Sequence, residues 1–180
     1  GAATCSHAEL IQNPEDTATL ARWGVPERRL FNLGNGIDLG RFDRREAMAG
    51  ERRELRAEWG VSDKTPVVVT VGRLVAEKGF RELFEAHRRL RRSGSNHELV
   101  VVGPTEAGKA DGLTEAEVAE ATADGLRLVG FSDRPERYYA AGDVFVLASH
   151  REGFPRAAME ASAMGLPVIA TDIRGCRQVV

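Results

Sequence analysis

From residue 66 onwards the chain alternates between short apolar runs and helix-like segments, and no other feature constrains the fold as strongly. There are five apolar runs: "PVVVTVG" (66–72), "ELVVVG" (98–103), "LRLVG" (126–130), "DVFVLAS" (143–149) and "PVIATD" (167–172). They are rich in Val, Ile and Leu and do not alternate cleanly with polar residues, which is typical of strands buried on both faces. Helices are predicted between them at 80–94, 114–125, 133–142 and 155–165. This order predicts an α/β fold with a doubly wound parallel sheet.

Residues 1–65 have a different organisation. They contain a predicted short helix (14–24), one strand with a glycine-rich loop (29–42), and a charged helix (44–60) with Leu55 and Trp59 as anchors. This region is too small to form a second domain of the same kind. We therefore interpret residues 1–65 as a linker or domain remnant, and residues 66–180 as the main domain.

Composition places the chain among ordinary globular proteins. Of its 180 residues, 42% are hydrophobic and 29% are charged, and the net charge is −2. Without a basic excess we expect no nucleic-acid partner, and the basic run at 87–92 is interpreted as a solvated helix face. No apolar stretch approaches the roughly 20 residues of a membrane span, and no signal peptide is visible. Cys5 and Cys176 have no metal-like spacing, so we expect free thiols in a cytosolic protein.

Small or polar residues end every predicted strand. They are Gly72, Gly103, Gly130, Ser149 and Thr171. Ligands of open parallel sheets bind beyond the carboxyl ends of the strands, and glycine there allows close approach to the backbone. A single glycine can instead serve only the turn, but several together favour a cleft. Arg73 and Lys78 follow the first strand, where a guanidinium and an ammonium can grip phosphate; the alternative is a pair of solvated surface cations.

The segment "EGFPRAAME" (152–160) places two carboxylates around a predicted helix start. The free N–H groups near Gly153 and Phe154 favour an anion. Glu152 would repel a phosphate unless it faces a hydroxyl-rich part of the ligand. Glu160, two helical turns further on, is another acceptor suited to hydroxyls, although it could also be an ordinary surface glutamate. A ligand that carries a sugar on each side of a diphosphate is a nucleotide sugar.

At this point a family resemblance emerges. The Glu-x7-Glu spacing in its context of "DVFVLAS" and "ASAMGLPVIATDIRG" resembles the retaining glycosyltransferases of family 4, which have the GT-B fold. Three other segments are similar to that family: "VGRLVAEKG" (71–79), "LGNGIDLGRF" (33–42) and "IQNPEDTATL" (11–20). The resemblance implies two Rossmann-like domains facing across a cleft. It identifies this chain as the donor-binding C-terminal domain with its linker, truncated at its C-terminus and without the N-terminal acceptor-binding domain.

The resemblance also implies roles for individual residues. Glu152, Arg73 and Lys78 are expected as the catalytic set, with the two cations on the donor diphosphate and Glu152 near the sugar hydroxyls. Glu160 is expected to accept hydrogen bonds from the ribose. The other substrate-binding residues implied are Gly72, Gly130, Phe131, Gly153 and Phe154; Gly130 and Phe131 belong to the base-binding loop, and Gly153 and Phe154 offer backbone N–H groups.

The implied partners are a nucleotide sugar, UDP being the expected carrier, and the absent N-terminal domain. No cofactor and no metal is expected, since the four histidines are scattered and His150 is interpreted as a residue lining the cleft. Without its partner domain the chain is expected to be inactive and able to self-associate. The full-length enzyme is expected to be cytoplasmic, peripheral at the inner membrane face, and to act in polysaccharide biosynthesis on a glycan or lipid-linked acceptor.

Two alternatives to the transferase stay open. One is a GT-B-fold nucleotide-sugar epimerase domain, and the other is a non-catalytic nucleotide-binding module. The pair Glu152 and Glu160 favours the transferase over both. A dinucleotide dehydrogenase is disfavoured, because "VTVGRLVAEKG" (69–79) lacks the G-x-G-x-x-G turn.

Overall fold

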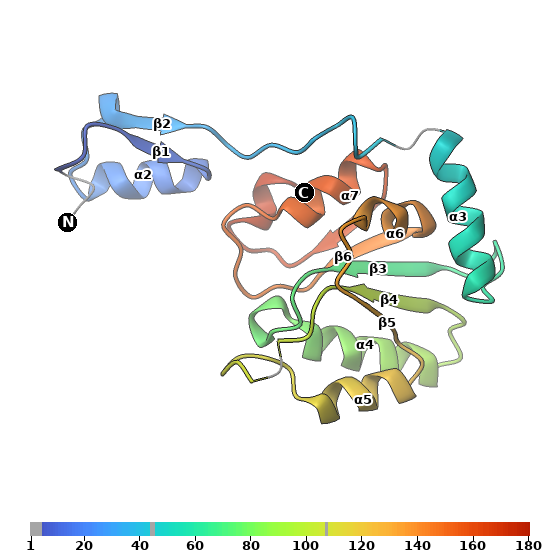
Figure 1. Ribbon diagram of the computed structural model, residues 1–180. Coiled ribbons are helices and arrows are strands. Elements are labelled where there is room, and N and C mark those ends of the chain that lie inside the picture. The colour runs from blue at the N-terminus through green and yellow to red at the C-terminus, as the bar shows by residue number, and fades with distance from the viewer. Residues whose placement is uncertain (1–4, 44–45, 107) are drawn as a thin grey trace.

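The computed structural model describes residues 5–43, 46–106 and 108–180, and its centre is a five-stranded parallel sheet (Figure 1). The strand order is β5-β4-β3-β6-β7. The strands are β3 (Val67–Val71), β4 (Glu98–Val102), β5 (Arg127–Gly130), β6 (Val144–Leu147) and β7 (Val168–Ala170). Each lies within one of the five apolar runs, so the predicted α/β fold with a parallel sheet is confirmed.

Helices cover both faces of this sheet, which explains why its strands are apolar throughout. The helices of one face are α4 (Phe80–Arg92) and α5 (Glu115–Ala123); those of the other are α6 (Pro135–Ala141) and α7 (Arg156–Ala163). Successive strand side chains point to opposite faces. Val67 and Val69 accordingly pack with α6 and α7, whereas Val68 packs with α4 and α5.

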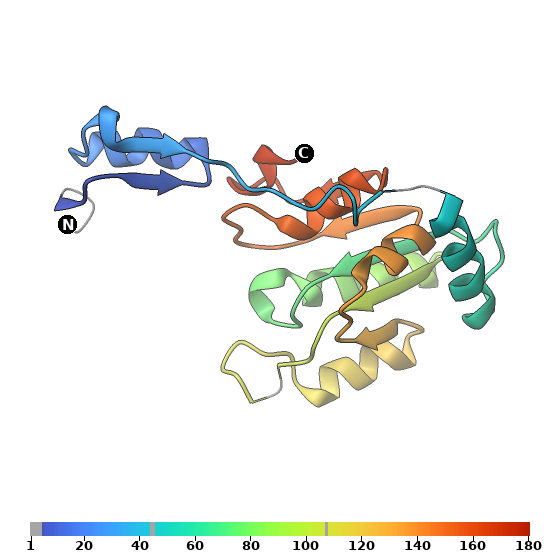
Figure 2. The same cartoon turned by 45° about the horizontal axis from the view of Figure 1, so that its top comes forward.

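The N-terminal residues form a small βαβ unit beside the main sheet. Its elements are β1 (Glu9–Ile11), α2 (Pro14–Arg22), a 3-10 turn (Glu27–Arg29) and β2 (Leu30–Asn32). The two strands pair in parallel, and Figures 1 and 2 show the unit standing to one side, joined by an extended segment. Strand β1 was not predicted, because a three-residue strand has no periodicity to read. The division of the chain at residue 66 stays a prediction.

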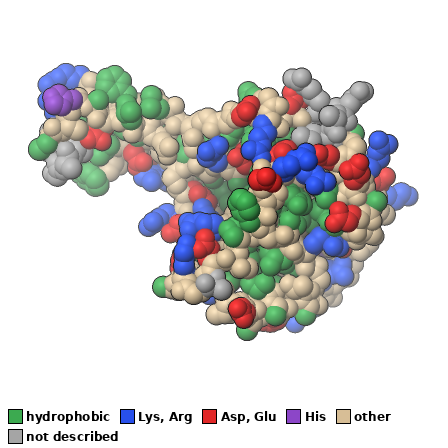
Figure 3. All heavy atoms as spheres, in the orientation of Figure 1, with side chains coloured by type: hydrophobic (Ala, Val, Ile, Leu, Met, Phe, Trp, Pro, Cys, Tyr) green, Lys and Arg blue, Asp and Glu red, His purple; other side chains and the backbone are tan. Residues whose placement is uncertain are grey.

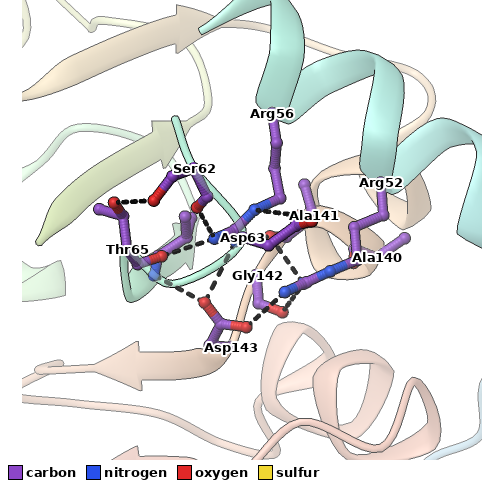
Figure 4. Close-up of polar contacts among 10 residues, drawn as sticks. Arg52, Arg56, Ser62, Asp63, Thr65, Ala140, Ala141, Gly142 and Asp143 are labelled. Atoms are coloured by element: carbon purple, nitrogen blue, oxygen red, sulfur yellow. Dashed lines mark hydrogen bonds and ion pairs between the residues drawn. The ribbon is translucent and has the colours of Figure 1, made fainter. Parts of the chain in front are cut away.

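Helix α3 (Glu46–Glu58) joins the main domain through two arginines, as Figure 4 shows. Arg56 is 1% exposed, and its guanidinium donates to the carbonyl oxygens of Ala141, Ser62 and Thr65. Arg52 donates to the carbonyl oxygens at the end of α6. Both arginines also pair with the Asp143 carboxylate, at 2.7 Å from Arg52 and 3.2 Å from Arg56.

Asp143 connects the arginines of α3 to the sheet. Its carboxylate accepts a hydrogen bond of 2.8 Å from the Val67 N–H at the start of β3. Burial alone would raise the pKa of Asp143, but the hydrogen bonds from Arg52, the Val67 amide and Arg56 outweigh it, so the pKa is lowered. A lowered folded-state pKa means stability that is present at neutral pH and is lost as the pH falls through that pKa.

Replacing Arg56 with Ala should lower the free energy of unfolding by about 1.5–3 kcal/mol, because the change removes a buried guanidinium that donates to three carbonyl groups and to the Asp143 carboxylate, although Arg52 still pairs with Asp143. Arg53→Ala, on the exposed side of the same helix, is the matched control and should change it by no more than about 0.5 kcal/mol. Urea unfolding of the two variants measures both values. Similar losses in the two variants would show that α3 does not depend on this contact.

Candidate functional site

The strand order creates one point where a ligand crevice is expected. From β3 the chain moves outwards to β4 and β5, and then returns to place β6 on the other side of β3. The loops that follow β3 and β6 therefore leave the same edge of the sheet in opposite directions. Crevices at such switch points are the usual ligand sites of doubly wound sheets.

A cavity of about 300 Å³ lies between these two loops. Its lining residues are Val71, Gly72, Arg73, Lys78, Leu147, Glu152, Pro155, Arg156 and Ala157. Three of them are cations and only one is a carboxylate, so the lining has an excess of positive charge. The cavity therefore suits an anion.

The Lys78–Glu152 ion pair is the central contact of this cavity. Lys78 Nζ lies 2.6 Å from Glu152 Oε1, and the two side chains are 22% and 11% exposed. The same carboxylate oxygen accepts a 2.7 Å hydrogen bond from the hydroxyl of Ser149, which is fully buried. Lys78 thus neutralises the carboxylate whose charge would otherwise repel a phosphate.

Arg73 and Lys78 do not act as a pair in this structure. The Arg73 guanidinium is more than half exposed and lies 4.0 Å from the Glu106 carboxylate, whereas Lys78 turns towards Glu152. Both still border the same cavity. The structure thus brings together Arg73, Lys78 and Glu152, as the sequence suggested, but with a different pairing.

Two glycines let the loops of the site pack against neighbouring backbone. A Cβ on Gly79, whose φ is +69°, would lie 2.0 Å from the Ala148 carbonyl oxygen. A Cβ on Gly103 would lie 1.8 Å from the carbonyl oxygen of Gly72. Gly72 itself has no such neighbour, since its nearest contact would be Phe80 at 3.9 Å.

Glu160 lies one turn beyond Arg156 along α7 and is partly buried. Its Oε2 accepts a 3.0 Å hydrogen bond from the Tyr139 hydroxyl. Burial raises the pKa of Glu160, although the Tyr139 hydrogen bond and the nearby Arg156 and Arg41 oppose the rise. Burial, together with the Glu160 charge, raises the pKa of Tyr139 well above its ordinary range. Glu160 is therefore not an ordinary solvated helix glutamate.

The remaining predicted residues lie outside the lining of this cavity. Gly130 ends β5, two strands away from β3, and Phe131 next to it is 77% exposed. Gly153 and Phe154 lie between Glu152 and the start of α7, and a Cβ on Gly153 would meet nothing within 4 Å. His150 is exposed and pairs with Glu82 of α4, at 2.9 Å. It does not line this cavity, and its interpretation as a residue lining the cleft stays a prediction.

Sequence reasoning missed three residues of the site. Arg156 adds the third cation; its place in the first turn of α7 could have signalled it. Ser149 was noted only as a strand end, and Tyr139 only as part of a predicted helix, because their carboxylate partners are distant in sequence.

A second hollow, of about 550 Å³, lies between β1, α2 and Arg174. It contains none of the cations that follow β3, so it is not the anion-binding cavity. Among the residues that the structure describes, no group of three or more His, Cys, Asp or Glu side chains is placed to hold a metal ion. No helix in the same ranges combines the length and apolar character that a membrane span requires.

Comparison with known families identifies the chain. Residues 51–180 match the family described as "Glycosyl transferases group 1". The chain belongs to this family. The match covers α3 from Glu51 onwards, the whole five-stranded sheet and both loops of the cavity.

Two curated relatives of this group 1 glycosyltransferase chain are glycosyltransferases of bacteria. It is 32% identical to the capsular polysaccharide biosynthesis glycosyltransferase CapM of Staphylococcus aureus over 96% of the chain and 44% of that protein. It is 30% identical to a D-inositol 3-phosphate glycosyltransferase of Geodermatophilus obscurus over 95% of the chain and 39% of that protein. The chain thus spans about two fifths of the length of these relatives.

Solved structures confirm the architecture. The crystal structure of Anabaena Alr3699/HepE in complex with UDP superposes with a TM-score of 0.82 at 21% identity, covering 97% of this chain and 47% of that one. WaaG, a glycosyltransferase involved in lipopolysaccharide biosynthesis, superposes with a TM-score of 0.77 at 21% identity, over 94% and 46% of the two chains. These likenesses show that the group 1 chain has one half of a GT-B fold.

The raised pKa of Glu160 predicts a pH-dependent effect of Glu160→Gln on stability. Between the ordinary value of 4.5 and the raised folded value, the folded state binds more protons, so the free energy of unfolding falls as the pH rises. Glutamine can still accept from Tyr139 but cannot ionise. The variant should therefore gain stability relative to the parent as the pH rises from 4 to 8.

Urea unfolding across this pH range measures the difference between the two proteins. Glu54→Gln, on the exposed side of α3, controls for the loss of a carboxylate and should show no such trend. A difference between Glu160→Gln and the parent that stays constant with pH would rule out a buried, ionising Glu160.

Proposed function

We propose that this chain is the donor-binding domain of a retaining glycosyltransferase of family 4, with a UDP-sugar as donor and a glycan or lipid-linked acceptor. The observation that carries the proposal is the cavity at the switch point, where Arg73, Lys78 and Arg156 surround one neutralised carboxylate. Such an excess of positive charge suits a diphosphate. Arg73, which lines the cavity and is more than half exposed, offers it a planar two-pronged donor.

The two ends of the donor follow from the two glutamates. Glu152 lies inside the cavity, held by Lys78 and Ser149, so it is in place to accept hydrogen bonds from sugar hydroxyls. Glu160 lies one turn beyond Arg156 along α7, outside the lining of the cavity, and would accept hydrogen bonds from the ribose. The N–H groups of Gly153 and Phe154 would serve the sugar and phosphates, and Gly130 with Phe131 the base.

Two comparisons support UDP as the carrier. HepE of Anabaena was crystallised with UDP and with UDP-glucose, and this chain superposes on both complexes over 97% of its length. The chemistry assigned to Arg73, Lys78 and Glu152 is electrostatic and positional, and requires no metal ion. Polysaccharide biosynthesis is the role named for the Staphylococcus relative, and we propose the same for this chain.

Transfer itself requires the acceptor domain. Holding two reactants in register can contribute roughly 7–11 kcal/mol to the lowering of a barrier. We therefore propose that the 180 residues alone bind donor but do not transfer sugar; turnover to a lipid-linked or glycan acceptor would disprove this.

Exposed Leu10, Trp23 and Phe31 gather on the N-terminal unit, as the green side chains at the left of Figure 3 indicate. We propose that they face the acceptor domain, and that without it the chain associates with itself, which sedimentation velocity at several concentrations tests.

Calorimetric titration with UDP, UDP-sugars, GDP-sugars and ADP-sugars tests the proposal as a whole. Preference for a UDP-sugar over UDP and over the other carriers is the expected result. An epimerase domain would also bind UDP-sugars, but it should interconvert epimers when joined to its second half. A regulatory module should bind a nucleotide without preferring the sugar-bearing form.

Arg73→Ala should weaken UDP binding by about 1.5–3 kcal/mol, the range for hydrogen bonds to charged groups. That corresponds to a factor of about ten or more in the dissociation constant. Arg89→Ala removes an exposed arginine from α4 that does not line the cavity, and should leave the affinity unchanged. Equal affinity of the Arg73 variant and the parent in calorimetry would exclude the diphosphate role.

Glu160→Gln and Glu152→Gln should separate the two ends of the donor. Because UDP and UDP-sugars share the ribose, loss of the Glu160 charge should weaken both ligands about tenfold or more. Glu152→Gln should leave UDP affinity nearly unchanged and lower UDP-sugar affinity. Calorimetry of both variants against both ligands makes the comparison. Equal losses for both ligands in both variants would contradict this division.

A further inference from the structure

The N-terminal βαβ unit contacts the loops of the site through one buried side chain. Asn13 stands between β1 and α2 and is 1% exposed. Its Oδ1 accepts a 2.9 Å hydrogen bond from the Glu15 N–H and so caps α2. Its Nδ2 donates to the carbonyl oxygens of Gly153 and Arg174, both at 3.3 Å.

These contacts define the orientation of the amide. The Glu15 backbone can only donate, and the carbonyl groups of Gly153 and Arg174 can only accept. A reversed amide would place oxygen against two oxygens and N–H against N–H. Asn13 in this one orientation satisfies all three groups.

Both carbonyl groups belong to the immediate surroundings of Glu152. Gly153 is the next residue in the chain, and Arg174 precedes Gly175, which packs on Glu152. A Cβ on Gly175 would lie 2.3 Å from the Glu152 carbonyl oxygen and 2.8 Å from its Cβ. One amide from residue 13 thus ties together the loop after β6 and the loop after β7, on either side of Glu152.

The other polar contacts between the unit and these loops lie at the surface. Asp16 pairs with Arg174, and Glu15 pairs with Arg177. Gln178 also donates to Glu15, at 3.2 Å. Exposed ion pairs of this kind are screened by water and contribute little. Asn13 is buried, and truncating it would leave two carbonyl groups without their donor.

We propose that Asn13 is a positioning residue for the donor site: through Gly153 and Arg174 it holds the backbone around Glu152, and so couples the N-terminal unit to sugar binding. The identity of the ligand in this inference rests on the proposed function. The link between Asn13 and the backbone around Glu152 does not. Asn13 touches neither the cavity nor its cations, so its effect reaches the ligand through Glu152.

Asn13→Asp separates this role from helix capping. Aspartate caps a helix as well as asparagine does, but it has no N–H to donate. Asn13→Ser is the second variant, since serine caps α2 with its hydroxyl and introduces no charge beside the carbonyl groups. Arg177→Ala is the control; it removes the surface ion pair with Glu15 from the same contact, together with a pair to Asp172, and leaves Asn13 intact.

Two measurements on the full 180-residue chain test whether Asn13 positions the backbone around Glu152. Amide hydrogen exchange, followed by mass spectrometry, should speed up in the segments 150–156 and 172–180 of both Asn13 variants and stay unchanged in β3 and β4. Calorimetry should show UDP-sugar affinity lowered about tenfold and UDP affinity lowered less than threefold. The Arg177 control should match the parent in both.

The outcomes distinguish this inference from the proposed function. If the parent chain binds no nucleotide sugar, the proposed function fails, and the exchange measurement alone still tests the link. If exchange in the two segments is unchanged, the link does not exist. If exchange rises but UDP-sugar affinity equals that of the parent, Asn13 is a structural contact only, and the positioning role is overturned.

Discussion

The site of this chain depends on the parallel pairing of β3 with both β4 and β6. That pairing places the carboxyl ends of β3 and β6 side by side at the switch point of the sheet. Lys78 and Glu152, 74 positions apart in sequence, meet there at 2.6 Å. The loops that carry the cations and lead into α7 leave the sheet at this same edge. The cavity between these loops therefore follows from this one arrangement.

Electrostatics then determines what the cavity can bind. A carboxylate beside a bound anion is unfavourable unless it is neutralised, and Lys78 neutralises Glu152. Glu160 is the opposite case, because it is partly buried, its pKa is raised, and its main partner is the Tyr139 hydroxyl. A charge held at a cost to stability is common at functional sites. The two glutamates are therefore chemically distinct, although they belong to one short motif.

Polar contacts to backbone carbonyl groups are used at both ends of the sheet. At the amino ends of β3 and β6, Arg56 and Asp143 attach α3 to the strands and to the end of α6. At the carboxyl ends, Asn13 attaches the N-terminal unit to the loops around Glu152. The first contact stabilises the domain away from the site, whereas the second lies directly behind it. In both, one buried side chain donates hydrogen bonds to several carbonyl groups at once.

The sequence by itself determined the elements of the main domain. The five apolar runs suit strands buried on two faces, and local residues mark helix ends: Thr114 and Glu117 form a capping box at the start of α5, and Gly94, Gly125 and Gly165 adopt positive φ after α4, α5 and α7. The loops that carry Arg73, Lys78 and Glu152 could also be predicted, because parallel strands expose their carboxyl ends at one edge. These features depend on side-chain periodicity and local backbone preference, which short segments encode.

Only the tertiary structure decided which side chains pair. Lys78 meets Glu152, Tyr139 meets Glu160, and Asn13 reaches Gly153 from 140 positions away. No pattern within a short segment encodes such contacts, because they depend on strand order and on the direction in which each loop leaves the sheet. Burial, which sets the pKa of Glu160, likewise exists only once α6 and α7 have packed on the sheet.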